Sequence, residues 1–351
     1  MSFRSWLSGK WILTLLVVLV SAELTARVED YLRLGVPFAA VPDRERDLVL
    51  HDAIGIRGRP NGVYKKWHLN SFGFRSPEVA RAPAPGCTRV MVLGASETFG
   101  LYESEDKEFP AQLDAALDRH GCFEVLNAAV AGLTLRGLER LWTGWGSQFG
   151  ARFVVVYPTP GFYLANSAPT YPGPPPSAPP PPARWSLRLM ERARDVIEIP
   201  DFIQNWRIAR QLAQATPADP GWAFTQAPGD RLGQFQDDLL RLVEIIRDAQ
   251  AIPVLVTHAN VFGRQAQPSD RAALDAWRQF TPRASADVLL EFEAAAARAT
   301  AAVAERAQVP LVDAAAVMNG RREWFADALH FTDEGAGTIA SLIAERILQV
   351  R

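Results

Sequence analysis

Three residues near opposite ends of the sequence have the types and spacing that suit acyl-transfer chemistry. Ser96 follows the apolar segment Val90 to Leu93 across two small residues, and a helical pattern begins after it. We therefore expect Ser96 just beyond the carboxyl end of a β-strand, where open α/β sheets carry their chemistry. Asp327 precedes His330 by three residues on a predicted loop. A carboxylate at that spacing can orient an imidazole, which then acts as the base toward a serine hydroxyl.

Each of these signals also has a purely structural interpretation. A serine after a strand can simply cap a helix, and Asp-x-x-His is also typical of a capped helix start with one solvated histidine. The order of the signals, with a long α/β pattern between them, favours a triad of Ser96, His330 and Asp327. Asp313 ends another predicted strand and is the rival carboxylate, but the spacing to the histidine favours Asp327.

Ordered blocks around these residues resemble the SGNH/GDSL hydrolases. Gly94-Ala-Ser96-Glu-Thr-Phe-Gly100 is similar to the first block of that family, Asn127-Ala-Ala-Val-Ala-Gly132 to the second, and Asp327-Ala-Leu-His330 to the fifth. The stretch Asn70-Ser-Phe-Gly-Phe-Arg75-Ser-Pro-Glu resembles the lead-in of membrane-anchored bacterial members. The resemblance covers roughly residues 65 to 350, apart from one large insertion, and the ordered set is more specific than any single block.

One block departs from the family pattern. The family has Gly-x-Asn-Asp after its third strand, and the Asn side chain helps to hold the oxyanion, whereas here Gly161 occupies that place. Loss of one such donor typically costs a few kcal/mol, on the order of a hundred- to a thousandfold in rate. The resemblance implies that the backbone N–H groups of Ser96 and Gly132 supply two donors. Asn166 and His258 are candidate replacements for the third, and the sequence does not place either one.

Alternating strand and helix patterns after residue 87 predict a flavodoxin-like, three-layer α/β/α fold with a parallel five-stranded sheet. The loop-like segment before Phe280 is expected to lack regular structure. The predicted strands are Val90–Leu93, Phe123–Ala128, Phe153–Tyr157, Pro253–Thr257 and Val309–Val312. The predicted helices lie at about 109–119, 136–149, 232–249, 286–307 and 339–350.

Three further regions complete the predicted organisation. Residues 1–34 form a signal-anchor helix, because Arg4 and Lys10 precede a continuous apolar run from Trp11 to Ala22 and orient its N-terminus toward the cytoplasm. A signal peptide cleaved after Ala22 is the alternative. Residues 35–86 are an irregular, proline-containing connector that packs on the hydrolase-like domain, 87–351. An insertion at about 159–228 contains a polyproline-like run, 169–182, and two amphipathic helices, 185–197 and 202–215.

Cys87 and Cys122 are the two cysteines of the chain and precede the first two predicted strands. In a flavodoxin-like order these strands are neighbours, so both thiols lie at the same edge of the sheet. In an exported protein such a pair can form a disulfide. The alternative is two unrelated small buried residues.

The composition and motifs of the chain indicate which kinds of molecule it is expected to bind. The 351-residue chain has a formal net charge of −2, which argues against nucleic acid as the main partner. The sequence contains no P-loop, dinucleotide fingerprint or Cys/His metal cluster, so we expect no cofactor and no metal. The resemblance implies an acylated glycan or another ester as substrate and the bacterial inner membrane as partner of the N-terminal helix. It leaves open an esterase, an O-acetyltransferase and a non-catalytic glycan-binding or assembly protein.

Overall fold

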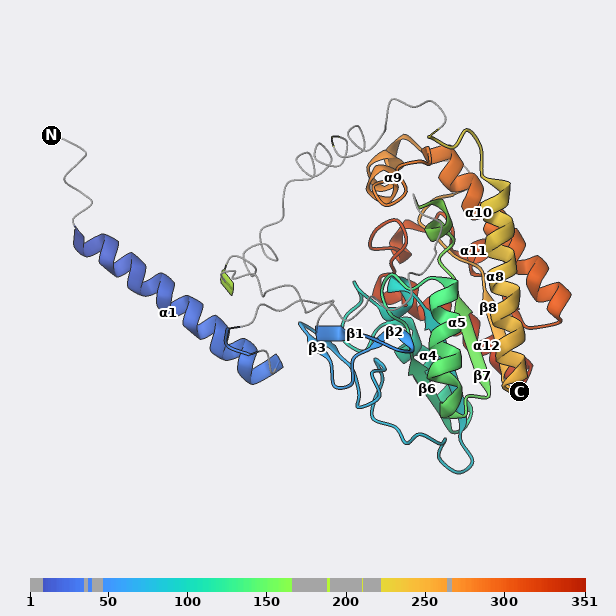
Figure 1. Cartoon of the computed structure of the whole chain (residues 1–351), viewed down its shortest axis with the longest axis horizontal. Helices are drawn as coiled ribbons and strands as arrows, with labels where there is room; N and C mark the ends of the chain where they lie inside the picture. Colours follow the sequence, from blue (N-terminus) through green and yellow to red (C-terminus); the bar gives the residue numbers. More distant parts are fainter. Residues whose placement is uncertain are drawn as a thin grey trace.

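A five-stranded parallel sheet forms the centre of the protein (Figure 1), which is described as a computed structural model over residues 9–34, 37–39, 47–165, 188–189, 210, 222–263 and 267–351. The strand order is β6-β5-β7-β8-β9, the 2-1-3-4-5 order of flavodoxin-like folds. The predicted fold class is therefore confirmed. The strands are β5 (Thr88–Gly94), β6 (Phe123–Asn127), β7 (Phe153–Tyr157), β8 (Ile252–Val256) and β9 (Leu311–Val312).

The sheet forms because its central strands carry valine-rich apolar runs, Val90–Leu93 in β5 and Phe153–Tyr157 in β7. Every residue of β5 and β7 is buried, as expected for parallel strands covered on both faces. In the register Gly94 pairs with Tyr157 and Val92 with Asn127, so the ends of β5, β6 and β7 meet at one edge of the sheet. Ser96 lies at that edge.

The long helices fall into two packed groups. Helices α4 (Phe109–Leu117) and α12 (Asp333–Gln349) pack against each other, and α8 (Gly229–Asp248) packs against both α5 (Leu135–Gly144) and α10 (Ala286–Ala307). Apart from the N-terminal helix α1 (Gly9–Leu34), the remaining helices among the described residues are short. They are α3 (Ser96–Phe99), α9 (Arg271–Arg278), α11 (Ala314–Met318) and the 3-10 turns Asp118–His120, Gly146–Phe149, Pro160–Leu164, Pro268–Asp270 and Arg322–Trp324.

Two segments differ from the sequence prediction. The segment before Phe280, predicted as a loop, contains α9, which buries Leu274 and Trp277. The connector contains two antiparallel hairpins, β1 (Val49–Asp52) with β2 (Gly55–Gly58) and β3 (Val63–Tyr64) with β4 (Trp67–His68). Strands of two to four residues are too short to give a readable alternation. The polyproline-like run and nearly all of the two helices predicted in the insertion lie outside the described residues.

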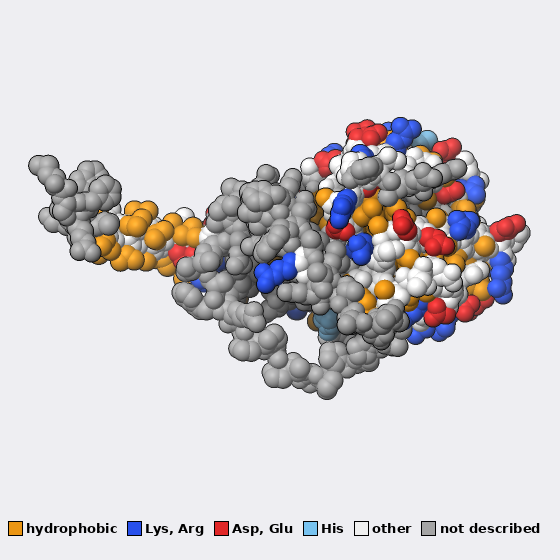
Figure 2. All heavy atoms as spheres, turned by 90° about the horizontal axis from the view of Figure 1, so that it is seen from above, with side chains coloured by type: hydrophobic (Ala, Val, Ile, Leu, Met, Phe, Trp, Pro, Cys, Tyr) orange, Lys and Arg blue, Asp and Glu red, His pale blue; other side chains and the backbone are white. Residues whose placement is uncertain are grey.

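The N-terminal helix α1 (Gly9–Leu34) is apolar and exposed over its first half. Trp11–Leu32 is the one candidate membrane span among the described residues, and its apolar side chains show as the orange rod in Figure 2. Midway along its length the helix contacts the insertion. The carboxylate of Glu23 accepts hydrogen bonds from the backbone N–H groups of Arg188 and Leu189, each at 3.0 Å. By its length and composition, the helix is long and apolar enough to cross a bilayer or to act as a signal sequence.

A disulfide joins Cys87 to Cys122, with their Cα atoms 4.6 Å apart. It closes the segment that contains β5, α3 and α4 and leads into β6. Of the two alternatives for these cysteines, the structure has the bonded pair.

Breaking this disulfide is expected to lower the free energy of unfolding by about 4 kcal/mol, the loop-entropy value for a separation of this size. The sequence separation is 35 residues. The measurement is urea denaturation of the full chain in detergent, with and without reductant. A Cys87→Ser, Cys122→Ser double variant is the control and should not respond to reductant; an equal response of both proteins would contradict the prediction.

Candidate active site

Ser96 lies on a sharp strand-to-helix turn. Strand β5 ends at Gly94, and Ser96 is the first residue of α3. A side chain at position 94 would collide with the Thr98 hydroxyl, so glycine is required there. Gly100 ends α3 in the left-handed conformation, with φ 85°. The turn leaves the backbone N–H of Ser96 at a helix start, where it has no acceptor within the helix.

Arg75, from the connector, anchors the other end of this short helix. Its Nη1 donates to the carbonyl oxygens of Phe99 and Gly100 at 2.6 and 2.5 Å, and its Nη2 forms an ion pair with Glu108 at 3.0 Å. Both charged side chains are almost fully buried. The lead-in segment therefore holds the helix that carries Ser96.

Replacing Arg75 with methionine is expected to lower the free energy of unfolding by about 3–5 kcal/mol, because the change leaves Glu108 buried without its cation. Chemical denaturation measures the loss. The double variant Arg75→Met, Glu108→Gln removes the orphaned charge and should recover part of the stability. Equal stability of the single variant and the wild type would show that the ion pair contributes little.

Asp327 and His330 are held together by a tight loop before α12. Asp327 Oδ1 accepts the backbone N–H groups of Leu329 and His330, each at 2.8 Å, and its Oδ2 lies 2.8 Å from His330 Nδ1. The rival carboxylate, Asp313, is engaged elsewhere. It caps α11 and accepts the hydroxyl of Thr257 at 2.9 Å. The structure therefore pairs His330 with Asp327.

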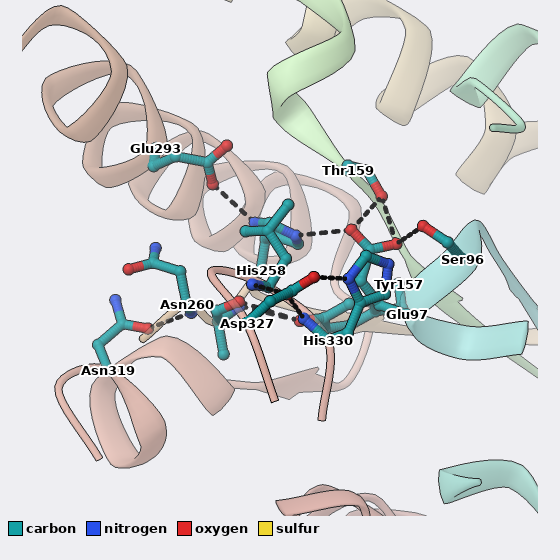
Figure 3. A network of polar contacts seen from close by, with 12 residues as sticks. Ser96, Glu97, Tyr157, Thr159, His258, Asn260, Glu293, Asn319, Asp327 and His330 are labelled. Carbon is teal, nitrogen blue, oxygen red and sulfur yellow. Dashed lines mark hydrogen bonds and ion pairs between the residues drawn. The ribbon is translucent and has the colours of Figure 1, made fainter. Parts of the chain in front are cut away.

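Ser96 and His330 do not hydrogen-bond to each other in this conformation. Ser96 Oγ donates instead to Glu97 Oε2 at 3.3 Å. Nε2 of His330 is buried and has no hydrogen-bond partner. Figure 3 shows Ser96, Glu97 and the Asp327–His330 pair gathered in one polar cluster. Glu97 therefore contacts the Ser96 hydroxyl, and its charge acts on the His330 imidazole.

Carboxylates dominate the electrostatics around His330. Burial alone would lower the pKa of His330, but the hydrogen bond to Asp327 and the charges of Glu97 and Glu103 raise it overall. The pKa of Asp327 is lowered, because its hydrogen bonds to His330 outweigh burial. Burial raises the pKa of Glu103 to about 7. The Tyr102 ring packs on the imidazole, with centroids 5.1 Å apart.

The loop after β6 brings Gly132 to the same edge of the sheet. Asn127, which begins the second block, donates from Nδ2 to the carbonyl oxygen of Thr98 at 3.1 Å and so ties this loop to α3. Gly132 has a left-handed backbone, with φ 83°, and a side chain built there would meet no atom within 4 Å. The space in front of Gly132 is therefore open.

Gly161, in the place of the family's Asn, and His258, a candidate for the third oxyanion donor, are both described by the structure. Gly161 is buried, and a side chain there would come to 3.5 Å from Trp277 Nε1 and 3.7 Å from Glu293 Oε1. His258 is buried with both ring nitrogens facing carboxylates, Nδ1 at 2.7 Å from Glu293 and Nε2 at 3.4 Å from Glu97. Asn166 lies outside the described residues.

Sequence reasoning missed three residues of this cluster, Glu97, Thr159 and Glu293. Thr159 Oγ1 lies 3.2 Å from both carboxylate oxygens of Glu97. Two signals were present in the sequence. Glu97 directly follows the proposed nucleophile, and Glu293 is the one charged residue on the alanine-rich buried face of α10. No group of three or more His, Cys, Asp or Glu residues that could hold a metal occurs in the described part of the chain.

Comparison with solved structures finds several chains with a similar fold. TesA aligns at a TM-score of 0.44 and 13% identity, covering 75% of this chain and 100% of its own. A lipase/acylhydrolase from Enterococcus faecalis aligns at 0.41 and 17%, covering 74% and 95%. A catalytic mutant of Axe2, an acetylxylan esterase from Geobacillus stearothermophilus, aligns at 0.41 and 13%, covering 74% and 94%.

Identities and TM-scores this low do not themselves assign an activity to this chain. No family model matches the sequence, and no curated protein matches it.

Proposed function

We propose that the protein is a serine ester hydrolase of the SGNH type, with Ser96 as nucleophile, His330 as general base and acid, and Asp327 as the group that orients His330. One observation carries the proposal. Asp327 holds Nδ1 of His330 at 2.8 Å, and Nε2 is left without a partner beside the carboxylate that bonds Ser96. When neutral, an imidazole held in this way can accept a proton on Nε2.

In the first half of the reaction, Ser96 Oγ attacks the ester carbonyl carbon while its proton passes to His330 Nε2. The backbone N–H groups of Ser96 and Gly132 donate to the oxyanion of the tetrahedral intermediate. The intermediate then collapses, and the C–O bond to the alcohol breaks as His330 Nε2 protonates the leaving oxygen. In the second half, His330 deprotonates a water that attacks the carbonyl carbon of the acyl-enzyme. The bond from that carbon to Ser96 Oγ then breaks as Nε2 returns the proton to Oγ, and the acid is released.

The proposed substrate is an acyl ester, in particular an acetyl ester, on a cell-surface glycan. Two features support this choice. The apolar helix α1 suits a membrane anchor that leaves the rest of the chain outside the cytoplasm, where such glycans lie. The open space in front of Gly132 gives room for an acyl group beside Ser96.

Turnover of small esters tests this proposal. The full chain in detergent is incubated with p-nitrophenyl acetate, and release of acetate from an acetylated glycan is measured in parallel. Hydrolysis of both supports an esterase. Acetyl transfer to an added sugar in excess of release to water would identify an acyltransferase with the same triad. Glycan binding without turnover of any ester, by a protein that remains folded, would contradict the proposed activity.

A further inference from the structure

A second histidine lies inside the fold, directly behind the proposed nucleophile. His258 follows β8, at the sheet edge where β5 and β7 also end, and lies between Glu97 on α3 and Glu293 on α10. All three side chains are at most 3% exposed. Figure 3 shows the row from Glu293 through His258 to Glu97 and on to Ser96. Burying ionisable side chains costs free energy unless opposite charges and hydrogen bonds between them offset that cost.

The charges of this row are complementary. Burial alone would lower the pKa of His258, but the adjacent carboxylates of Glu293 and Glu97 raise it to about 10. The ring is therefore an imidazolium at neutral pH, and each N–H donates to a carboxylate. Burial would raise the pKa of Glu97, but its hydrogen bond to His258 and the charges of the two histidines lower it overall. Glu97 is thus an ionised acceptor for Ser96 and Thr159.

We propose, on the basis of the proposed function, that Glu97 is a positioning residue: supported by His258 and Glu293, its carboxylate holds the Ser96 hydroxyl in the resting enzyme and sets the charge of His330. In the resting state the hydroxyl donates to Glu97 and not to His330. Substrate binding then turns the hydroxyl to Nε2 of His330. The negative charge of Glu97 favours the imidazolium that forms when His330 takes the serine proton.

The proposal predicts a direction for the pH dependence. His330 faces Asp327 on its own loop, Glu97 on α3 and Glu103 on the loop after α3. Glu97 in turn faces His258, His330 and the hydroxyl of Thr159. Removal of the Glu97 charge lowers the pKa of His330. Since His330 acts as a base only when neutral, the acid limb of kcat/KM then moves to lower pH.

The experiment combines nitrogen NMR of the ring nitrogens with the pH profile of ester turnover. The chain has five histidines, and His258→Gln and His330→Gln variants assign the two signals. In the wild type we expect His258 to remain doubly protonated up to at least about pH 8. In Glu97→Gln we expect the midpoint of His330 and the acid limb of kcat/KM to fall together by about one pH unit. Glu105→Gln, the same change on an exposed carboxylate of the loop after α3, is the matched control and should move neither.

Glu293→Gln gives a second test that does not depend on contact with Ser96. The variant lacks the charge of the closer partner of His258, so in this variant His258 should lose its second ring proton below about pH 9. A neutral His258 at pH 7 in the wild type would overturn the proposal, as would a His330 midpoint unchanged by Glu97→Gln. These NMR results are obtained without catalysis. Absence of ester turnover would therefore overturn the proposed function alone.

Discussion

Replacing Ser96 with alanine is expected to lower kcat/KM for ester hydrolysis at least about a thousandfold, because the variant lacks the hydroxyl that forms the acyl-enzyme in the proposed mechanism. Fold and stability should change little, since the hydroxyl makes one hydrogen bond, of 3.3 Å, to Glu97. The measurement is the rate of p-nitrophenyl acetate hydrolysis by the full chain in detergent. Circular dichroism checks that the variant is folded.

Ser341→Ala is the matched control for this variant. Ser341 lies on α12 and donates to the carbonyl oxygen of Gly337 at 2.8 Å. Its replacement removes the same group from an exposed position and should leave turnover unchanged. Retention of most of the activity by Ser96→Ala would reject Ser96 as nucleophile.

Replacing Asp327 with asparagine is expected to lower kcat/KM by about a thousandfold at neutral pH. An amide N–H facing Nδ1 of His330 favours the tautomer that is protonated on Nε2, which cannot accept the serine proton. The backbone N–H groups of Leu329 and His330 can still donate to the amide oxygen, so the loop should keep its shape. Steady-state kinetics across pH measure the effect.

Asp313→Asn separates this prediction from a general effect of losing a hydrogen-bonded loop carboxylate. Asp313 caps α11 and accepts the Thr257 hydroxyl, so its replacement should cost about 1 kcal/mol of stability without a comparable loss of kcat/KM. If the two variants lost activity equally, the pairing of Asp327 with His330 would not explain the chemistry.

The strands and the contact between Asp327 and His330 could be predicted from the sequence because their signals are local. Strand β7, for example, has the predicted bounds, since Phe153–Tyr157 is an uninterrupted apolar run that ends at a proline. The spacing of Asp327 and His330 likewise fixes their contact within one loop. Helix α9 was missed because it is short and buries few of its residues.

The buried row of Glu293, His258 and Glu97 behind Ser96 could not be predicted. These residues lie far apart in the sequence and come together only because of the order of the strands in the sheet. Glu97 and His258 are separated by 161 positions in the chain, and His258 and Glu293 by 35. The sequence indicated His258 as a residue at a strand end but gave no sign of its partners. A buried carboxylate on a helix such as Glu293 becomes informative only once the strand it faces is known.

The most direct test of the central proposal is covalent labelling by a fluorophosphonate, read by intact mass. We expect the wild-type chain to gain one adduct, which peptide mapping places on Ser96. Ser96→Ala should gain none, and His330→Ala should react far more slowly because it lacks the base. A folded wild-type protein that gains no adduct, or a Ser96→Ala variant that labels as fast as the wild type, would contradict an activated serine at this site.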